Sequence, residues 1–333
     1  MDLLSIIDLA RERGASDIHF TDRRPPLIRV DGELINVGAD NMGPQALEAV
    51  TRELAQERYD EFLERGEIDF TFQAPHNRLR VNIYRQRGVP AAALRLIPEK
   101  IPRFEELGIP QAVREMADLH QGLVLFTGPT GSGKSTTMAS LINEINHSRA
   151  CHILTLEDPI EYIHQHQKAI VNQREIGGDS YSFANALRAA LRQDPDVILV
   201  GEMRDLETIS TAVTAAETGH LVLATLHTSS AAATIDRIID VFPAHQQQQI
   251  RVQLAETLRG VVAQRLLPKK GQSGRVMACE ILMGTSAVKN LIREGKLHQI
   301  PATMETGSKF GMQTFEQSLK RLAEQGLIEP TTF

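Results

Sequence analysis

Residues 128–136 read Gly-Pro-Thr-Gly-Ser-Gly-Lys-Ser-Thr and follow the apolar run 123–126. This stretch is a complete G-x-x-x-x-G-K-[ST] phosphate loop between a predicted strand and a predicted helix. Its glycines let the backbone curl, so that successive N–H groups point at phosphate oxygens. The residues predicted to hold a nucleoside triphosphate are Gly128, Pro129, Thr130, Gly131, Ser132, Gly133, Lys134, Ser135 and Thr136.

Two side chains of this loop have predicted roles in holding ATP together with Mg²⁺. Lys134 supplies a positive charge for the β- and γ-phosphates, and the Ser135 hydroxyl is a ligand for the magnesium ion. The helix expected to begin near Lys134 adds the positive end of its dipole. The alternative is a Gly/Ser turn that matches the pattern without binding a nucleotide. Because every fixed position is filled, we predict that ATP and Mg²⁺ bind here.

Length and composition indicate a globular protein of two domains. The chain has 333 residues, of which 42% are hydrophobic. No segment approaches the roughly 18 uninterrupted apolar residues of a membrane span, and the first residues lack the pattern of a signal peptide. Two cysteines without a C-x-x-C pair fit a reducing cytoplasm. The formal net charge of −6 gives no electrostatic reason to expect nucleic acid as a partner.

The first hundred residues alternate between apolar and polar side chains as β-strands do. Residues 27–35 predict a hairpin, because Asp31-Gly32 suits a two-residue turn with positive φ. Further predicted elements are strands at Ile68–Phe72, Leu79–Tyr84 and Ala91–Ile97, and helices at Leu3–Glu12 and Pro44–Glu64. The pattern predicts a smaller α+β domain over residues 1–97.

Prolines at 98, 102 and 110 break regular structure, and we predict an interdomain linker over residues 98–112. Beyond it, short continuous apolar strands alternate with helical stretches. These strands are Leu123–Phe126, Ile153–Leu156, Val197–Val200 and Leu221–Ala224. Unbroken apolar strands suit a parallel sheet covered on both faces, so the fold class is α/β with a nucleotide-binding core over residues 113–333. Residues 287–294 and 312–324 predict helices near the C-terminus.

Carboxylates follow the second of these strands, at the sheet edge where the catalytic groups of such folds gather. They are Glu157, Asp158 and Glu161. Carboxylates near Mg²⁺ can hold its water shell or orient an attacking water. The alternative is a capped turn on the protein surface.

The third strand ends in Gly201 and Glu202, where phosphate-loop enzymes usually carry an Asp at the first position. Glu202 is then the acid best placed to polarise water. The alternative is an acidic residue that stabilises the amino end of the helix predicted from Leu206. The fourth strand lies between His220 and His227, and a histidine at that level can donate a hydrogen bond to the γ-phosphate. A core histidine bonded to backbone is the alternative.

Phosphoryl transfer also gains from a cation on the transition state. No arginine of the phosphate-loop domain has this role by motif. The amino-terminal strands offer Arg78, Arg80, Arg85, Arg87 and Arg95. The alternative for each is an exposed strand arginine that only favours solubility.

Several motifs in order closely resemble the PilT-type ATPases of bacterial type IV pili, in the secretion ATPase superfamily. They are Gly128–Thr136 as Walker A, Leu156–Tyr162 as the Asp box, Leu199–Asp205 as Walker B, and His220 with Ala224–Ser229 as the His box. Residues 287–294 are similar to the AIRNLIRE helix of the retraction subfamily, with Val288 and Lys289 in place of Ile and Arg.

The resemblance implies a PAS-like amino-terminal domain, a RecA-like ATPase domain and a ring of six identical subunits. It implies Glu202 as the catalytic carboxylate, and Arg80 and Arg95 as the best matches for arginines that reach the nucleotide. Glu157, Asp158 and Glu161 would assist Mg²⁺ and water, with Glu157 and Glu202 acting on the metal through water. The implied place is the cytoplasmic side of the inner membrane, on a pilus platform protein, with membrane association only through partners.

The leading hypothesis is therefore a hexameric motor that hydrolyses ATP to retract pili and drive twitching motility. One alternative is a pilus assembly or secretion ATPase, although such relatives usually carry a four-cysteine zinc module that two cysteines cannot make. Another is a regulatory or accessory subunit with low ATPase activity. A nucleic-acid translocase is disfavoured by the acidic balance and by the absence of a basic-aromatic stretch.

Overall fold

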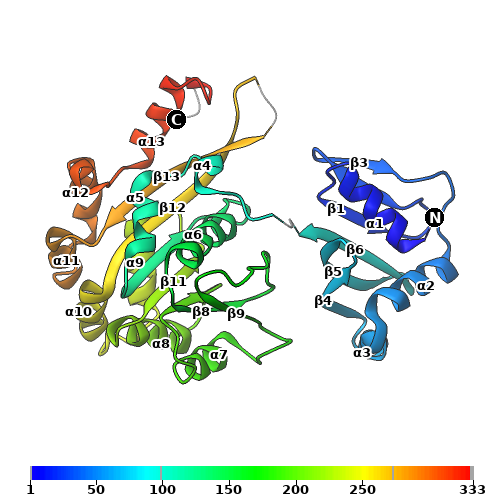
Figure 1. Cartoon of the computed structure of the whole chain (residues 1–333), viewed down its shortest axis with the longest axis horizontal. Coiled ribbons are helices and arrows are strands. Elements are labelled where there is room, and N and C mark those ends of the chain that lie inside the picture. Colours follow the sequence, from blue (N-terminus) through cyan, green and yellow to red (C-terminus); the bar gives the residue numbers. More distant parts are fainter. Residues whose placement is uncertain (1, 98–99, 272–273, 331–333) are drawn as a thin grey trace. The chain divides into compact units, whose positions relative to one another are not determined.

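The computed structural model describes residues 2–97, 100–271 and 274–330. The chain divides into two compact units, Met1–Lys100 and Ile101–Phe333 (Figure 1). Each unit has its own hydrophobic core, so each is described by itself. No helix in the described part of the chain is long and apolar enough to cross a membrane.

The first unit is an antiparallel sheet of six strands, in the order β3-β2-β1-β6-β5-β4. Its strands are β1 (Asp17–Phe20), β2 (Leu27–Val30), β3 (Glu33–Asn36), β4 (Glu67–Ala74), β5 (Asn77–Gln86) and β6 (Val89–Ile97). The helices are α1 (Leu3–Glu12), α2 (Pro44–Ala55), the 3₁₀ turn η1 (Gln56–Arg58) and α3 (Tyr59–Arg65). Apolar side chains of the helices and of alternate strand positions form one core cluster, as expected for a sheet with one covered face.

Most predicted elements of this unit are present. The helix α1 has the predicted bounds, and the β2–β3 hairpin turns at Asp31 (φ 49°) and Gly32 (φ 90°). The prediction of one helix over Pro44–Glu64 is wrong, because Gln56 adopts φ 49° and interrupts the chain between α2 and α3. Strand β1 was not predicted.

The predicted linker over residues 98–112 also needs correction. Residues 98–99 lie outside the described residues. Residues 101–112 belong to the second unit and include α4 (Phe104–Leu107) and the start of α5 (Gln111–Arg114). Phe104 is buried in a core cluster of that unit, so apolar burial holds this segment in place despite its prolines.

The second unit is built on a sheet of seven strands, in the order β13-β12-β7-β11-β10-β8-β9. All neighbours are parallel except β12 and β13. The strands are β7 (Gly122–Thr127), β8 (His152–Glu157), β9 (Ile170–Glu175), β10 (Val197–Val200), β11 (Leu221–Leu226), β12 (Leu258–Pro268) and β13 (Arg275–Met283). The predicted parallel core is thus present, with β9, β12 and β13 added to the four predicted strands.

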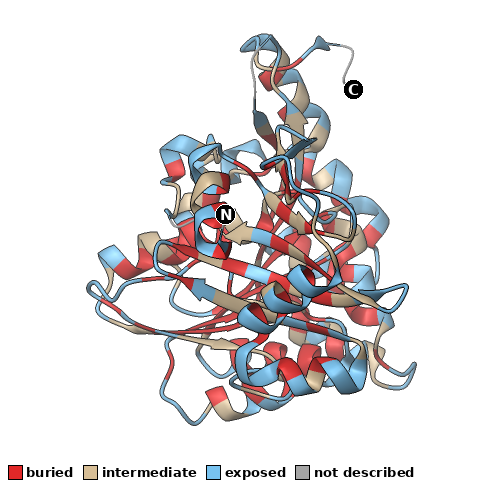
Figure 2. Cartoon of the chain, turned by 90° about the vertical axis from the view of Figure 1, so that its right-hand side faces the viewer, coloured by how far each residue is buried: buried red, intermediate tan, exposed pale blue. Residues whose placement is uncertain are grey.

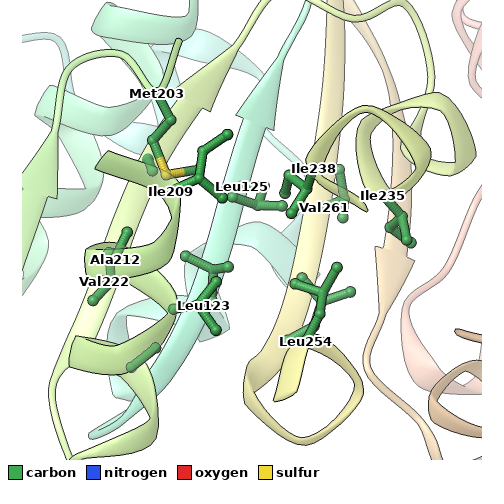
Figure 3. Packing of buried hydrophobic residues seen from close by; sticks show 14 of the residues in the cluster. Leu123, Leu125, Met203, Ile209, Ala212, Val222, Ile235, Ile238, Leu254 and Val261 are labelled. Atoms are coloured by element: carbon green, nitrogen blue, oxygen red, sulfur yellow. The ribbon is translucent and has the colours of Figure 1, made fainter. Parts of the chain in front are cut away.

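Helices cover both faces of this sheet. They are α6 (Lys134–Ser148), α7 (Phe183–Ala190), α8 (Leu206–Glu217), α9 (Ala231–Asp240), α10 (Gln247–Thr257), α11 (Ser286–Arg293), α12 (Ile300–Glu305) and α13 (Phe315–Glu324), with 3₁₀ turns η2 (Glu115–Asp118), η3 (Leu297–Gln299) and η4 (Ser308–Phe310). Successive strand residues enter different clusters: Leu123 and Leu125 pack with α8, α9 and α10, whereas Val124 and Phe126 pack with α6. Figure 3 shows the first of these clusters, with Leu125 between Ile209 and Ile238. Buried positions follow the strands and one side of the helices (Figure 2).

The register aligns the carboxyl ends of the central strands. Thr127 of β7 lies opposite Leu226 of β11, and Val200 of β10 lies opposite both Leu156 of β8 and Ala224 of β11. The residues that follow these strands therefore meet at one edge of the sheet, beside the phosphate loop.

Candidate functional site

The phosphate loop turns tightly after β7 because Gly128 has no side chain. Its φ is +143°, and a Cβ there would lie 2.4 Å from the Gln264 carbonyl oxygen and 2.7 Å from the Ser132 Oγ. Gly131 (φ 77°) and Gly133 (φ 91°) continue the turn into α6. The loop thus takes the curled backbone path that phosphate-binding amides require.

Lys134 is the first residue of α6 and is buried. Its Nζ donates hydrogen bonds to the carbonyl oxygens of Gly128 (2.8 Å) and Pro129 (3.1 Å). Burial lowers the pKa of Lys134, and the negative charges of Glu202 and Glu161 oppose that shift. The ammonium group is therefore held over the loop and faces the acidic residues predicted to act on ATP.

One buried polar atom of the loop supports a ligand site. The Ser132 Oγ is buried and has no hydrogen-bond partner among the described residues. Buried hydroxyls are ordinarily bonded. A phosphate oxygen is an acceptor of the kind this hydroxyl lacks, so the loop fits a nucleotide phosphate.

Glu202 lies beside the loop, as predicted, and its side chain is only 18% exposed. Its Oε1 is 3.1 Å from the His227 Nε2 and 2.5 Å from the Arg204 Nε. The strand register explains the histidine contact. Glu202 and Leu226 each lie two residues beyond the paired Val200 and Ala224, and His227 follows Leu226 directly. A carboxylate with donors on one oxygen keeps its other oxygen for water.

Gly201 explains why the acid at this strand end is Glu202. The Gly201 N–H donates to the Leu156 carbonyl oxygen at 2.7 Å, and a Cβ would lie 3.0 Å from the same oxygen. Thr225 donates a hydrogen bond to the Gly201 carbonyl. A side chain at position 201 would therefore be tight against the backbone of β8, which favours glycine over the Asp that phosphate-loop enzymes usually carry there.

The carboxylates after β8 differ in environment. Thr155 Oγ1 (2.6 Å) and Gln173 Nε2 (3.1 Å) donate to the Glu157 Oε1, and burial raises the pKa of Glu157. Asp158 and Glu161 are exposed, and the peptide between Asp158 and Pro159 is cis. All three lie at the edge where β8 ends, and their roles toward Mg²⁺ and water stay a prediction.

The structure separates the two predicted histidines. His227 follows the carboxyl end of β11 and contacts Glu202, whereas His220 precedes the amino end of the same strand. Six residues of strand span about 20 Å. The His220 Nδ1 lies 2.9 Å from the Ala215 carbonyl oxygen, which is the backbone-bonded alternative. The prediction that His220 acts beside the phosphate loop is therefore wrong within this unit.

Three contacts of the site were not predicted. Arg204 binds Glu202, and the Tyr162 hydroxyl lies 3.1 Å from the Thr136 Oγ1. Thr127 donates to the Thr228 carbonyl oxygen at 2.7 Å, which ties the phosphate loop to the loop of His227. Arg204 and Tyr162 lie within the Walker B and Asp-box motifs, close in sequence to Glu202 and Glu161. That closeness was the signal that could have predicted their place in the site.

In the first unit, Arg80 of β5 and Arg95 of β6 lie directly opposite each other. Both are exposed. The Arg95 Nε binds the Asp17 Oδ1 at 3.0 Å, whereas Arg80 has no ion-pair partner within the described residues. Arg85 lies over the Phe62 ring at 5.3 Å. Arg80 is thus the more available of the two predicted arginines.

Comparison with known proteins identifies the family. The model of the family described as type II/IV secretion system protein matches residues 2–327. The chain belongs to this family. Its resemblance to the PilT-type ATPases of this secretion family is confirmed by the similarities that follow.

A *Pseudomonas aeruginosa* protein named type IV pilus retractation ATPase PilT is 47% identical over 333 residues, covering 98% of this chain and 96% of its own length. A *Neisseria gonorrhoeae* protein named twitching motility protein is 49% identical over 307 residues, covering 92% of this chain and 82% of its own. A crystal structure of the pilus retraction motor PilT with bound ADP has a TM-score of 0.93 and 49% identity, covering 99% of this chain and 95% of that one. The predicted fold class is confirmed.

Proposed function

We propose that the protein is the hexameric motor that hydrolyses ATP to power retraction of type IV pili. The protein is a phosphate-loop ATPase, and relatives of nearly equal length are named for pilus retraction and twitching motility. The observation that carries the proposal is the meeting of Lys134, Glu202 and His227 at one sheet edge. The proposed place of action is the cytoplasmic face of the inner membrane, on a platform protein of the pilus, with no nucleic acid involved.

The residues of the site suggest how ATP is held and hydrolysed. Amides of the loop and the Lys134 ammonium bind the phosphates, and the Ser132 hydroxyl donates to a phosphate oxygen. Glu202 accepts a hydrogen bond from the attacking water and orients it toward the γ-phosphate. The imidazole N–H of His227 donates a hydrogen bond to Glu202 or to the γ-phosphate, so that it distinguishes ATP from ADP.

The side chains present fit a magnesium ion. The donors at the edge are oxygens, namely the Ser135 hydroxyl and the carboxylates of Glu157 and Glu202, as a hard cation prefers. No group of three metal-ligating side chains occurs in the described part of the chain. Mg²⁺ is usually held by few protein ligands together with substrate phosphates. When bound, the ion neutralises charge on the β- and γ-phosphates.

The C-terminal helix that resembles the retraction subfamily is compatible with that role. Val288 fills the core of the second unit, and the Lys289 Nζ lies 3.8 Å from a Glu256 carboxylate oxygen. Both differences from the family pattern are therefore accommodated. Alternate closing and opening of subunits around a ring of six would convert phosphate binding and release into movement of the platform protein.

The arginines of the first unit give one test of the ring mechanism. We expect Arg80→Ala to lower kcat at least tenfold, because a cation on the transition state is worth roughly 10³–10⁵ in rate. Arg95→Ala should lower kcat less, because Arg95 already pairs with Asp17. Arg29→Ala is the matched control, since Arg29 lies across from Asp17 on the same face of the sheet. Phosphate release by the purified protein measures all three, and equal rates for Arg80→Ala and Arg29→Ala would contradict the assignment.

The motor's direction is tested in the host. Deletion of the gene should leave excess surface pili and abolish twitching, because filaments are assembled but not withdrawn. Restoring the wild-type gene should return both to normal, whereas the Glu202→Gln gene should restore neither. A deletion strain without pili would instead identify an assembly ATPase, and normal twitching would identify an accessory subunit.

A further inference from the structure

Glu280 lies on the edge strand β13, and its carboxylate contacts the amino end of α9. The Glu280 Oε1 of β13 accepts a hydrogen bond from the Ala231 N–H at 2.6 Å, across 49 residues of sequence. Ala231 is fully buried and Glu280 is half-buried. The first N–H groups of a helix have no partner within the helix, and its dipole favours an anion there. The contact is therefore a short, charge-assisted hydrogen bond to the first residue of α9.

The chain that enters α9 is the loop of His227. Its carbonyl at Thr228 accepts from Thr127, the last residue before the phosphate loop. The Thr228 Oγ1 lies 2.7 Å from the Thr234 Oγ1, which also donates to the Ser230 carbonyl oxygen. The loop is thus tied to β7 at one point and to α9 at another. Since Glu280 holds the first residue of α9, the position of His227 beside Glu202 depends on β13 as well.

The helix has a separate N-cap, so Glu280 is not needed for that role. The Ser230 Oγ accepts from the Ala233 N–H at 3.2 Å, as an N-cap serine should. Among the residues that the structure describes, the Glu280 carboxylate accepts its hydrogen bond from the Ala231 N–H. Burial raises the pKa of Glu280, and the Ala231 N–H and the Arg265 charge oppose that shift. The Glu280 carboxylate therefore ties β13 to the first residue of α9, at the end of the loop that carries His227.

We propose that Glu280 is a positioning residue for ATP hydrolysis: by binding the Ala231 N–H it fixes the start of α9 and, through the Thr228 loop, the placement of His227 against Glu202. The inference rests on the proposed role of Glu202. Misplacement of a catalytic group by 1 Å can cost about 10²-fold in rate, so a lost anchor should affect kcat more than nucleotide affinity.

Three substitutions of Glu280 separate the effect of hydrogen-bond distance on kcat from the effect of the carboxylate charge. Gln keeps an acceptor oxygen at the same distance but removes the charge. Asp keeps the charge but is shorter by one carbon–carbon bond, about 1.5 Å, so its oxygens no longer reach the Ala231 N–H. We expect Glu280→Asp and Glu280→Ala to lower kcat about tenfold or more, with KM for ATP within about threefold of wild type. Glu280→Gln should keep kcat within about threefold.

Two further variants make the outcome decisive. Thr314→Ala removes the N-cap of α13, which accepts from the Gln317 N–H at 3.2 Å on a helix that does not carry the catalytic loop. It should lower the melting temperature but leave kcat unchanged. Glu202→Gln, assayed beside it, reports on the catalytic role itself. Two outcomes, each with Glu202→Gln inactive, would show that the positioning role is wrong. One is a wild-type kcat for Glu280→Asp. The other is a loss of kcat in Glu280→Gln as large as that in Glu280→Asp. If Glu202→Gln retains turnover, the catalytic role of Glu202 is wrong, and the positioning role that rests on it is wrong with it.

Should Glu280→Ala not fold, the comparison of Asp with Gln remains, because both keep a polar side chain of similar size in the half-buried site. A positioning role through hydrogen-bond reach predicts that Gln is active and Asp is not. A role through charge predicts the reverse order. Phosphate release at several ATP concentrations, by the full-length protein, gives kcat and KM for each variant.

Discussion

Glu202→Gln should lower kcat for ATP hydrolysis by about 10²–10⁴ while nucleotide still binds, because general acid–base catalysis contributes roughly that factor. The amide oxygen can still accept from His227 and Arg204, so the packing of the strand end is kept. What is lost is the carboxylate oxygen that accepts from the attacking water. Phosphate release measures kcat, and titration with a fluorescent ADP analogue measures binding.

Glu207→Gln is the matched control for this prediction. Glu207 lies five residues further on, in the first turn of α8, and its half-exposed side chain pairs with Arg188 rather than with the site. Its turnover should equal that of the wild type. A Glu202→Gln protein that retains more than about a tenth of wild-type kcat would remove Glu202 from the catalytic role.

The sequence predicted this part of the site because local patterns determine it. Largely apolar strands of four to six residues end at Thr127, Glu157, Val200 and Leu226, and parallel strands bring their carboxyl ends to one edge. Once the strands are in register, Glu202 comes level with Leu226, the residue before His227. The phosphate loop is equally local, since its glycines and Lys134 lie within seven residues.

What the sequence could not predict depends on residues far apart in the chain. The Gln264 Nε2 donates to the Thr137 Oγ1 across 127 residues, and Glu280 binds Ala231 across 49. Strand β12 follows α10 directly, from Thr257 to Leu258, so no turn residues mark its start. His220 was misplaced for a different reason: it precedes its strand, so in the predicted parallel sheet it lies at the amino end, away from the phosphate loop.

After Glu202→Gln, the substitution expected to affect ATP turnover most is Lys134→Ala. Lys134→Ala should weaken nucleotide binding about 10- to 150-fold, because a hydrogen bond to a charged group is worth about 1.5–3 kcal/mol. Turnover should fall below detection, since the same charge stabilises the transferring phosphate. The Gly128 and Pro129 carbonyls also lose their donor, so the loop is less well held before the nucleotide arrives.

Stability separates this result from unfolding. Burial lowers the pKa of Lys134, which means that the folded state binds its proton less tightly than the unfolded chain does. Burial of the lysine charge therefore opposes folding at neutral pH, whereas its hydrogen bonds to the Gly128 and Pro129 carbonyls favour it, so we expect Lys134→Ala to change the melting temperature little. Lys296→Ala is the control, because its side chain is 52% exposed and pairs with Glu294 away from the loop. A folded Lys134→Ala protein that binds the ADP analogue like the Lys296→Ala control would contradict the role of Lys134 as the phosphate ligand of the loop.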